Sequence, residues 1–251
     1  EADRGKITTS DGTVVADNLT TVSLVFIPNQ IEKNKIEEIA TNISEILNCD
    51  KSVILEHLNK KSSIERVHPE GRRLSYDQAD KIDDYHYKGV YLVKESKRVY
   101  PFNKLLCHTL GYVGIDNQGL SGLELQYDES LTGAYGSIQY YSDAKGNNLS
   151  LKENYVEPTN GMNIELTVNY DIQSSVEREL DNAMEKYNAD GAWAIAMDPN
   201  SGEILAMASR PGFDPNNYQD YTEEEINRNL AIWASYEPGS TFNVVASKID
   251  N

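Results

Sequence analysis

The sequence predicts an α+β fold divided into two domains, residues 1–159 and 160–251. Apolar runs of strand length and longer runs of helical period alternate through residues 4–156. A turn-rich stretch, residues 157–161, then breaks the pattern, and more regular elements follow it. With 251 residues, 39% of them apolar, the chain is long enough to bury a hydrophobic core.

The first domain is expected to begin with two strands followed by two helices. Polar and apolar residues alternate over residues 4–26, and the turn formers at 10–12 divide this segment into strand, turn and strand. Apolar residues then recur at helical spacing over residues 31–47, which predicts a helix there. A shorter helix is expected over residues 51–58.

The rest of the first domain is expected to contain further strands. Residues 89–93 form a short apolar strand pattern, and residues 105–114 are a second apolar run. Two more strands are predicted at 135–141 and 149–156, on either side of a turn at 143–147.

The second domain is expected to open with a strand at 164–168 and a long helix capped by Asn169 or Asp171. Strand-length apolar runs at 192–197 and 203–209 are joined by turn formers and predict a hairpin. The residues expected on the buried face of the long helix are Ile172, Val176, Leu180, Ala183, Met184 and Tyr187.

The last part of the second domain is expected to be a loop followed by a helix. Residues 210–218 contain two prolines and several turn formers, so we expect an irregular loop there. A helix is predicted over residues 223–233, and the acidic residues at its start interact favourably with the helix dipole.

Charge and cysteine content exclude several classes of function. A formal net charge of −17 argues against binding to nucleic acid or to an anionic membrane surface. Cys49 and Cys107 lack metal-ligand spacing, which argues against structural zinc. Burial as small apolar side chains is the favoured interpretation, with a disulfide between them as the alternative. No apolar stretch is long enough to span a bilayer, so any membrane anchor is expected before residue 1.

One heptapeptide carries candidate chemistry. Tyr-Glu-Pro-Gly-Ser-Thr-Phe occupies residues 236–242, and a serine after Pro-Gly is, taken alone, more often a helix cap than a nucleophile. The segments that precede it favour the nucleophile. They are residues 196–209 and Pro-Gly-Phe-Asp-Pro-Asn at 211–216. Together these segments resemble the hairpin, loop and nucleophile motif of penicillin-binding transpeptidases.

The first domain carries its own ordered set of motifs. These motifs are Arg-Gly-Lys-Ile at 4–7, Arg-Val-Tyr-Pro at 98–101, Gly-Tyr-Val-Gly at 111–114, Gly-Leu-Ser-Gly-Leu-Glu at 119–124 and Leu-Thr-Gly at 131–133. They resemble the non-catalytic pedestal of class B penicillin-binding proteins. The stretches at 95–98 and 114–120 are closest to the sporulation-specific branch of that family.

The resemblance implies a dimerisation-type pedestal domain followed by the first part of a transpeptidase domain. It also implies a serine-type D,D-transpeptidase in which Ser240 attacks a peptidoglycan stem peptide, with β-lactams as inhibitors and no cofactor or metal. A membrane glycosyltransferase is the partner expected for the pedestal. The family carries a single N-terminal membrane anchor, outside this chain, and its domains lie on the extracytoplasmic side.

Two departures from the family pattern qualify these expectations. Thr9 and Ser10 stand where the family usually has Asp-Arg, and Asn243 stands where Ser-x-x-Lys requires the general-base lysine. An amide cannot accept a proton, and neither Ser-x-Asn nor Lys-Thr-Gly or Lys-Ser-Gly occurs in the chain. Truncation, continuation of the chain beyond Asn251, and joining of a distant segment after Phe242 each account for the missing motifs, and the last would also account for Asn243. We expect the fragment itself to be inactive.

Alternative functions and roles remain open from the sequence. One alternative is a catalytically dead scaffold that positions a glycosyltransferase. Another is a β-lactam sensor, which would share Ser240 with the enzyme. The pedestal residues Arg4, Gly5, Arg98 and Glu124 are either structural or partner contacts, and an Arg and a Glu in such motifs more often form a structural ion pair.

Overall fold

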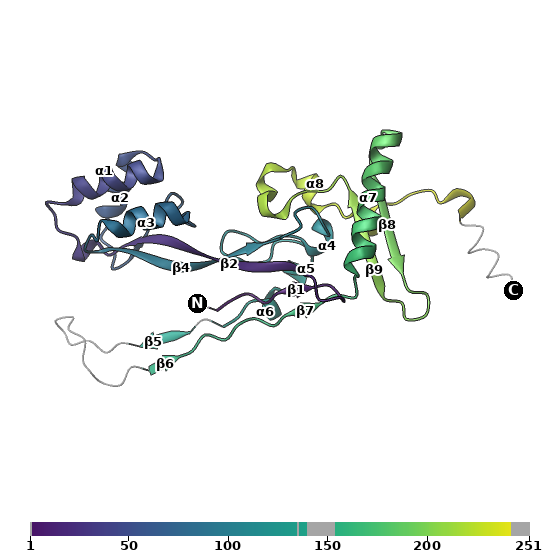
Figure 1. Cartoon of the computed structure of the whole chain (residues 1–251), viewed down its shortest axis with the longest axis horizontal. Helices are drawn as coiled ribbons and strands as arrows, with labels where there is room; N and C mark the ends of the chain where they lie inside the picture. Colours follow the sequence, from purple (N-terminus) through teal and green to yellow (C-terminus); the bar gives the residue numbers. More distant parts are fainter. Residues whose placement is uncertain (1, 135, 140–153, 242–251) are drawn as a thin grey trace. The chain divides into compact units, whose positions relative to one another are not determined.

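The computed structural model describes residues 2–134, 136–139 and 154–241 as a chain of mixed helices and strands, which confirms the α+β prediction (Figure 1). The chain divides into two compact units, and it passes between them several times. The first unit comprises Glu1–Arg4, Asn18–Val99 and Gly133–Gly161. The second comprises Gly5–Asp17, Tyr100–Thr132 and Met162–Asn251.

Three helices pack on strands in the first unit. Its core joins Leu24 and Phe26 of β2 to Ile39 and Ile43 of α1 and Ile54 of α2, all at most 1% exposed. The elements of this unit are β2 (Val14–Phe26), from Asn18 onward, η1 (Pro28–Gln30), α1 (Ile36–Leu47), α2 (Lys51–Leu58), β3 (Glu65–Arg66), α3 (Tyr76–Asp84), β4 (Val90–Val99), β5 (Ser137–Gln139) and β6 (Asn154–Val156). β3 and β4 both pair with β2.

The predicted helices of this unit are present, with one shortened and one additional helix. α1 starts at Ile36, because residues 33–35 form a turn, preceded by a bend at Ile31, rather than the first helical turn expected there. α2 has the predicted bounds of 51–58. The additional helix, α3, begins with a capping box between Ser75 and Gln78, a local signal that its low apolar content obscured.

The strands of this unit differ in length from the predictions. β4 extends to Val99, well past the predicted end at residue 93. β5 and β6 pair antiparallel within the strands expected at 135–141 and 149–156, while the predicted turn at 143–147 lies outside the described residues.

A small sheet opens the second unit. β1 (Ile7–Thr8) pairs antiparallel with the first part of β2, as the strand-turn-strand prediction requires, and parallel with β7 (Ile164–Glu165), which is shorter than the predicted 164–168. Gly5 is needed where the chain enters this sheet, because a Cβ atom there would lie 1.8 Å from the Met162 carbonyl oxygen. Ile7 lies in the core of the sheet and is fully buried.

The remaining elements of the second unit are short helices, one long helix and a hairpin (Figure 1). They are α4 (Cys107–Leu110), α5 (Gly122–Gln126), α6 (Asp128–Leu131), α7 (Tyr170–Tyr187), β8 (Ala192–Met197), β9 (Ile204–Arg210), η2 (Pro215–Asp220), α8 (Glu223–Asn227), α9 (Leu230–Trp233) and η3 (Gly239–Thr241). β8 and β9 form the predicted hairpin, a sheet of two strands among the described residues.

Two predictions for the end of the chain are wrong in detail. Residues 215–220 form 3₁₀ turns that overlap the end of the segment expected to be irregular, 210–218, with the Asp214 side chain capping them. The helix expected over 223–233 is two short helices, because Arg228 and Asn229 adopt extended backbone conformations and Asn229 caps α9.

The buried face of α7 agrees only in part with the prediction. Gln173 and Glu177 are its buried residues, whereas Ile172 and Tyr187, expected on the buried face, are 38% and 69% exposed. Val176, Leu180, Ala183 and Met184, also expected on this face, are half-buried. Gln173 and Glu177 are satisfied by Met207 on β9 and by Leu106, the residue before α4, so polar side chains share this face with apolar ones.

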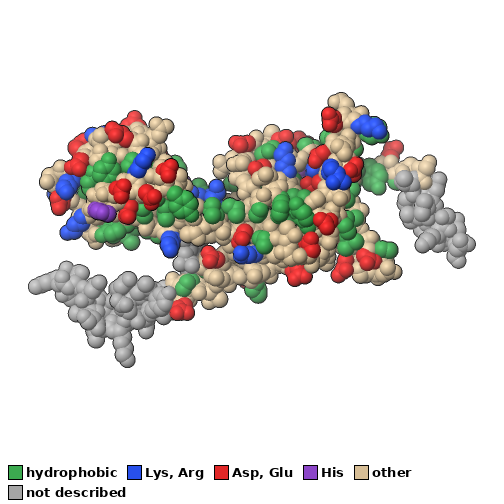
Figure 2. All heavy atoms as spheres, viewed as in Figure 1, with side chains coloured by type: hydrophobic (Ala, Val, Ile, Leu, Met, Phe, Trp, Pro, Cys, Tyr) green, Lys and Arg blue, Asp and Glu red, His purple; other side chains and the backbone are tan. Residues whose placement is uncertain are grey.

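None of the described helices is long and apolar enough to cross a bilayer. Both described cysteines are free thiols, with Cys107 buried and Cys49 half-buried against the core of the first unit. On the face in Figure 2, acidic side chains are spread over the surface rather than gathered into one patch.

We predict that Ile43→Ala destabilises the first unit by about 2–5 kcal/mol, because it removes buried methyl groups and leaves a cavity. Ile43 is completely buried, whereas Ile64 in the same unit is 62% exposed. Ile64→Ala is therefore the matched control, with an expected change within about 0.5 kcal/mol. Urea unfolding of both variants measures the difference, and equal effects would contradict this core assignment.

Candidate functional site

Ser240 lies in an exposed turn at the end of the described chain. It is the middle residue of η3 (Gly239–Thr241), seven residues after α9 ends. Gly239 adopts a positive φ of 55° with nothing within 4 Å of its Cβ position, so the turn is open on that side. The serine hydroxyl is therefore accessible.

No described residue donates a hydrogen bond to the Ser240 hydroxyl or accepts one from it. Asn243, expected at the general-base position, lies outside the described residues. The described residues hold no group of three or more His, Cys, Asp and Glu side chains suited to a metal ion. What the structure describes in detail is the framework that leads to Ser240.

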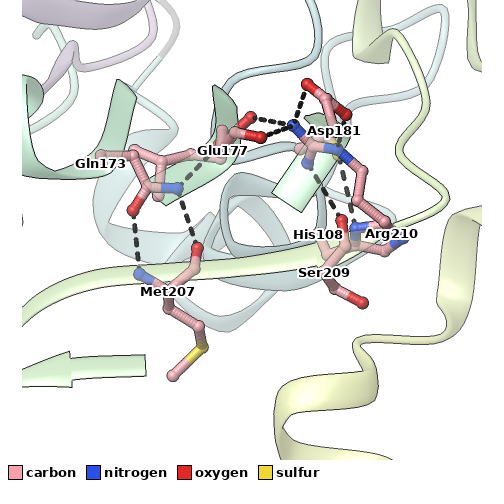
Figure 3. Close-up of polar contacts among 9 residues, drawn as sticks. His108, Gln173, Glu177, Asp181, Met207, Ser209 and Arg210 are labelled. Atoms are coloured by element: carbon pink, nitrogen blue, oxygen red, sulfur yellow. Dashed lines mark hydrogen bonds and ion pairs between the residues drawn. The ribbon is translucent and has the colours of Figure 1, made fainter. Parts of the chain in front are cut away.

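The centre of that framework is the buried carboxylate of Glu177 on α7 (Figure 3). Its Oε1 accepts from the Leu106 backbone N–H at 2.8 Å and from Gln173 Nε2 at 2.7 Å. Its Oε2 accepts from Arg210 Nη2 at 3.0 Å. Glu177 is 6% exposed and Arg210 is 7% exposed. The two charges form a buried ion pair with several satisfied hydrogen bonds.

Arg210, the last residue of β9, links this pair to a second carboxylate. Its Nε and Nη2 both donate to Asp181, one turn along α7 from Glu177. Burial opposes the guanidinium charge, but the hydrogen bonds to Asp181 and the charge of Glu177 outweigh it, so the pKa of Arg210 is raised. The hydrogen bond from Arg210 in turn lowers the pKa of Asp181. Arg210 and Asp181 are therefore both ionised at neutral pH.

Gln173 holds the outer edge of β9. Its side-chain amide accepts from the Met207 N–H at 2.8 Å and donates to the Met207 carbonyl at 2.9 Å. Asn169 N–H also donates to the Leu205 carbonyl at 2.9 Å. The start of α7 thus takes the place of a neighbouring strand along β9, which leaves fewer edge groups without partners.

Residues 100–113 contact the segment that follows β9, at Asn216 and Glu225. The Asn216 side-chain amide binds both backbone groups of Tyr100, as Gln173 binds those of Met207. It accepts from the Tyr100 N–H at 2.9 Å and donates to the Tyr100 carbonyl at 3.0 Å. His108 Nε2 lies 2.9 Å from the Glu225 carbonyl oxygen, and burial lowers the pKa of this imidazole. The neutral ring donates through Nε2, because a carbonyl can only accept.

An aromatic cluster completes this contact. Phe213 is fully buried, with its ring 5.2 Å from His108 and 6.0 Å from Tyr112 in edge-on arrangements. Tyr112 also stacks on Tyr218 at 4.3 Å. Cys107 lies in the same cluster, and burial raises the pKa of its thiol to about 11. This thiol is a packing group rather than a nucleophile.

The sequence interpretation missed this buried charge network. Its only signal was the spacing of Gln173, Glu177 and Asp181 at every fourth residue, which places three polar side chains on one face of a helix. Such a stripe is ordinarily solvated, so spacing alone could not show that Gln173 and Glu177 are buried.

The pedestal residues singled out in the sequence are buried. Arg4 is 5% exposed, Arg98 is 3% and Glu124 is 0%. Arg98 Nη1 donates to Asn18 Oδ1 at 3.3 Å, and the Tyr100 hydroxyl donates to Glu124 Oε1 at 3.3 Å. Side chains this buried offer little surface to a partner, which favours their structural interpretation.

The second unit also contains a cavity of about 450 Å³ beside α8. Arginine and carboxylate side chains both line it, so its charge favours no single class of ligand. Ser240 is not among the lining residues, which are Asp190, Arg210, Pro211, Thr222, Glu224, Glu225, Arg228 and Leu230.

Comparison with known protein families finds a match for each of two segments of the chain. Residues 1–166 match the model of the penicillin-binding protein dimerisation domain. Residues 192–249 match the penicillin-binding protein transpeptidase domain. The segment 100–132 therefore falls in the first match, although it packs in the same compact unit as the second.

Individual relatives support the same grouping. The chain is 43% identical to stage V sporulation protein D of Bacillus subtilis over 98% of its own length and 38% of the relative. It is 35% identical to the peptidoglycan D,D-transpeptidase FtsI of Escherichia coli over 68% of the chain and 29% of that protein. The chain thus spans well under half the length of these relatives.

Solved structures share the fold. Penicillin-binding protein 2X of Streptococcus thermophilus matches with a TM-score of 0.68 and 26% identity, covering 97% of this chain and 40% of that one. Penicillin-binding protein 2 of Helicobacter pylori, solved in a complex with MreC, matches with a TM-score of 0.75 and 24% identity, covering 100% and 51%. The second likeness is one of fold alone.

We predict that Arg210→Met destabilises the second unit by about 3–5 kcal/mol, because it leaves the Glu177 carboxylate buried without its counter-charge. Arg178 lies on the same helix as Glu177, and its side chain is 66% exposed beside Glu179. Arg178→Met is the matched control, with an expected change within about 0.5 kcal/mol. Thermal and chemical unfolding measure both, and equal stabilities would contradict the burial of this pair.

Proposed function

The chain belongs to the class B penicillin-binding proteins, and on that premise we propose that it is part of a peptidoglycan D,D-transpeptidase. The match to the transpeptidase model over residues 192–249, which includes Ser240, carries this proposal. The described chain supplies the pedestal and the approach to the nucleophile. The domain division at residues 159 and 160 remains part of the proposal.

In the proposed reaction, the Ser240 hydroxyl oxygen attacks the carbonyl carbon of the penultimate D-Ala of a stem peptide. The bond to the terminal D-Ala nitrogen breaks, and that nitrogen leaves with a proton as the free amino acid. An amine of a neighbouring peptide strand then takes the acyl group and regenerates the serine. β-Lactams enter at the same serine, with ring opening in place of D-Ala release.

The serine position supports this role. A turn that follows Pro-Gly and leaves Ser240 exposed permits approach of a peptide carbonyl. The residue at 243 opposes rapid reaction, because an asparagine amide cannot take the hydroxyl proton. We therefore propose that this chain, as it stands, acylates slowly or not at all.

Biological context is inferred from the relatives. The 43% identity to stage V sporulation protein D favours a role in sporulation over vegetative division or elongation. By analogy with the family, we infer an N-terminal membrane anchor outside this chain and an extracytoplasmic location. Penicillin-binding protein 2 of Helicobacter pylori forms a complex with MreC. A membrane glycosyltransferase is the partner we infer for the pedestal here.

A catalytically dead scaffold is the second candidate function, favoured by one observation, the asparagine at residue 243. Such a scaffold would retain the pedestal and its partner while losing acyl transfer. The two candidates make opposite predictions for the intact protein treated with a labelled penicillin.

We predict that the full-length protein forms a covalent adduct with labelled penicillin on Ser240, detected by peptide mass spectrometry. Ser240→Ala is expected to abolish the adduct because no other group replaces the nucleophile. Ser235→Ala, at an exposed serine five residues earlier, is the matched control and is expected to leave acylation unchanged. Absence of an adduct at saturating penicillin would favour the scaffold.

We predict that Asn243→Lys raises the acylation rate on the order of 10²- to 10⁴-fold, because it restores a group able to accept the serine proton. Asn227→Lys adds the same charge at an exposed position of α8 and is expected to have no such effect. Stopped-flow or gel-based acylation kinetics measure both variants. Equal rates for the two would show that residue 243 does not limit the reaction.

A further inference from the structure

We propose that Glu177 is a positioning residue for acylation at Ser240, acting through Arg210 and the hydrogen bonds of β9. The inference rests on the proposed function, since it concerns the reaction of that serine. It assigns to a buried network, which contacts no substrate, control over the segment that carries the nucleophile.

The first step is that Glu177 fixes Arg210. The carboxylate accepts from three donors, and the guanidinium is nearly buried between it and Asp181. The cavity beside the network measures about 10 Å³, space for at most one water molecule. The side of the network that faces Leu106 and Met207 is thus too closed to hold a ligand, and the larger cavity beside α8 is lined by Arg210 but not by Glu177.

The second step leads from Arg210 to α9. Arg210 Nη1 donates to the carbonyl of Ser209 at 3.1 Å, which holds the last peptide of β9. The Ser209 hydroxyl oxygen then accepts from the Leu230 N–H at 3.1 Å, at the first residue of α9. The place where α9 begins is therefore set by the end of β9 and, through Arg210, by Glu177.

The third step leads from α9 toward the serine. The Arg228 guanidinium lies over the ring of Trp233 at 4.2 Å. Tyr236 meets the ring of Trp193 on β8 with centroids 5.7 Å apart. The chain is held at these points until four residues before Ser240. Movement of α9 would displace this approach, and a displacement of about 1 Å costs up to 10²-fold in rate.

The network has a second arm in the region that matches the dimerisation domain. Leu106, whose N–H donates to Glu177, has a positive φ of 58°, a conformation that a branched residue rarely adopts. A buried, charged acceptor helps to hold this strained peptide in place. The Glu177 carboxylate therefore connects this region directly to β9. A change in the backbone position of Leu106 would alter, through Glu177 and Arg210, where α9 begins.

The test uses the full-length protein and the variant Glu177→Gln, which keeps an acceptor for Leu106 but removes the charge that holds Arg210. Glu179→Gln is the matched control, since Glu179 is on the same helix and its side chain is 66% exposed. Two readouts are compared at a temperature where circular dichroism shows both variants to be folded. They are the rate of acylation by labelled penicillin and amide hydrogen exchange in peptides covering residues 227–241.

We expect Glu177→Gln to acylate about 10- to 100-fold more slowly than the control and to exchange faster over residues 227–241. Faster exchange with unchanged acylation would make the network merely structural and overturn the proposal. Slower acylation with unchanged exchange would exclude the route through α9 and overturn it as well.

If the proposed function itself is wrong, the experiment gives a different result. In that case the wild type and the Glu179→Gln control also form no adduct. Hydrogen exchange then still decides whether Glu177 orders the segment leading to Ser240, because this readout needs no chemistry at the serine.

Discussion

The buried ion pair between Glu177 and Arg210 is the constraint on which the second unit depends. Removing two charges from water costs several kcal/mol for each ion, and only close pairing with full hydrogen bonding offsets that cost. Here the carboxylate takes three donors, and the guanidinium reaches a second carboxylate at Asp181. Because those donors come from α7, β9 and the start of α4, the pair fixes how three segments meet.

Elements with a regular apolar period were predictable from sequence, and those held by polar contacts were not. α2, α7 and the β8–β9 hairpin follow the predicted pattern closely, because burial of apolar residues drives their formation. The fully buried residues of α7 were not predicted, since Gln173 and Glu177 are satisfied by backbone groups and by an arginine 33 residues from Glu177. The periodicity of a local segment gives no information about partners that lie so far away along the chain.

The candidate site divides in the same way. Ser240 could be proposed as the nucleophile because its motif is contiguous and the surrounding segments resemble the family in order. Its chemical partners could not, since family members draw them from separate motifs that this chain lacks. The supporting framework also escaped sequence analysis, because its clamps from Asn216 and Gln173 bind backbone groups whose partners carry no distinctive residue type.

The path of the chain through its two units has a consequence for inheritance. Residues 5–17, 100–132 and 162–251 belong to one unit, so pieces of it are encoded far apart and separated by pieces of the other. A recombination event with a related gene near residue 160 would join α7 and β9 from one parent to the Leu106 and Tyr100 segments of another. The exchanged halves must then agree across the contacts made by Glu177 and Asn216. Mosaic genes with a crossover there would be tolerated only between parents that share those contacts.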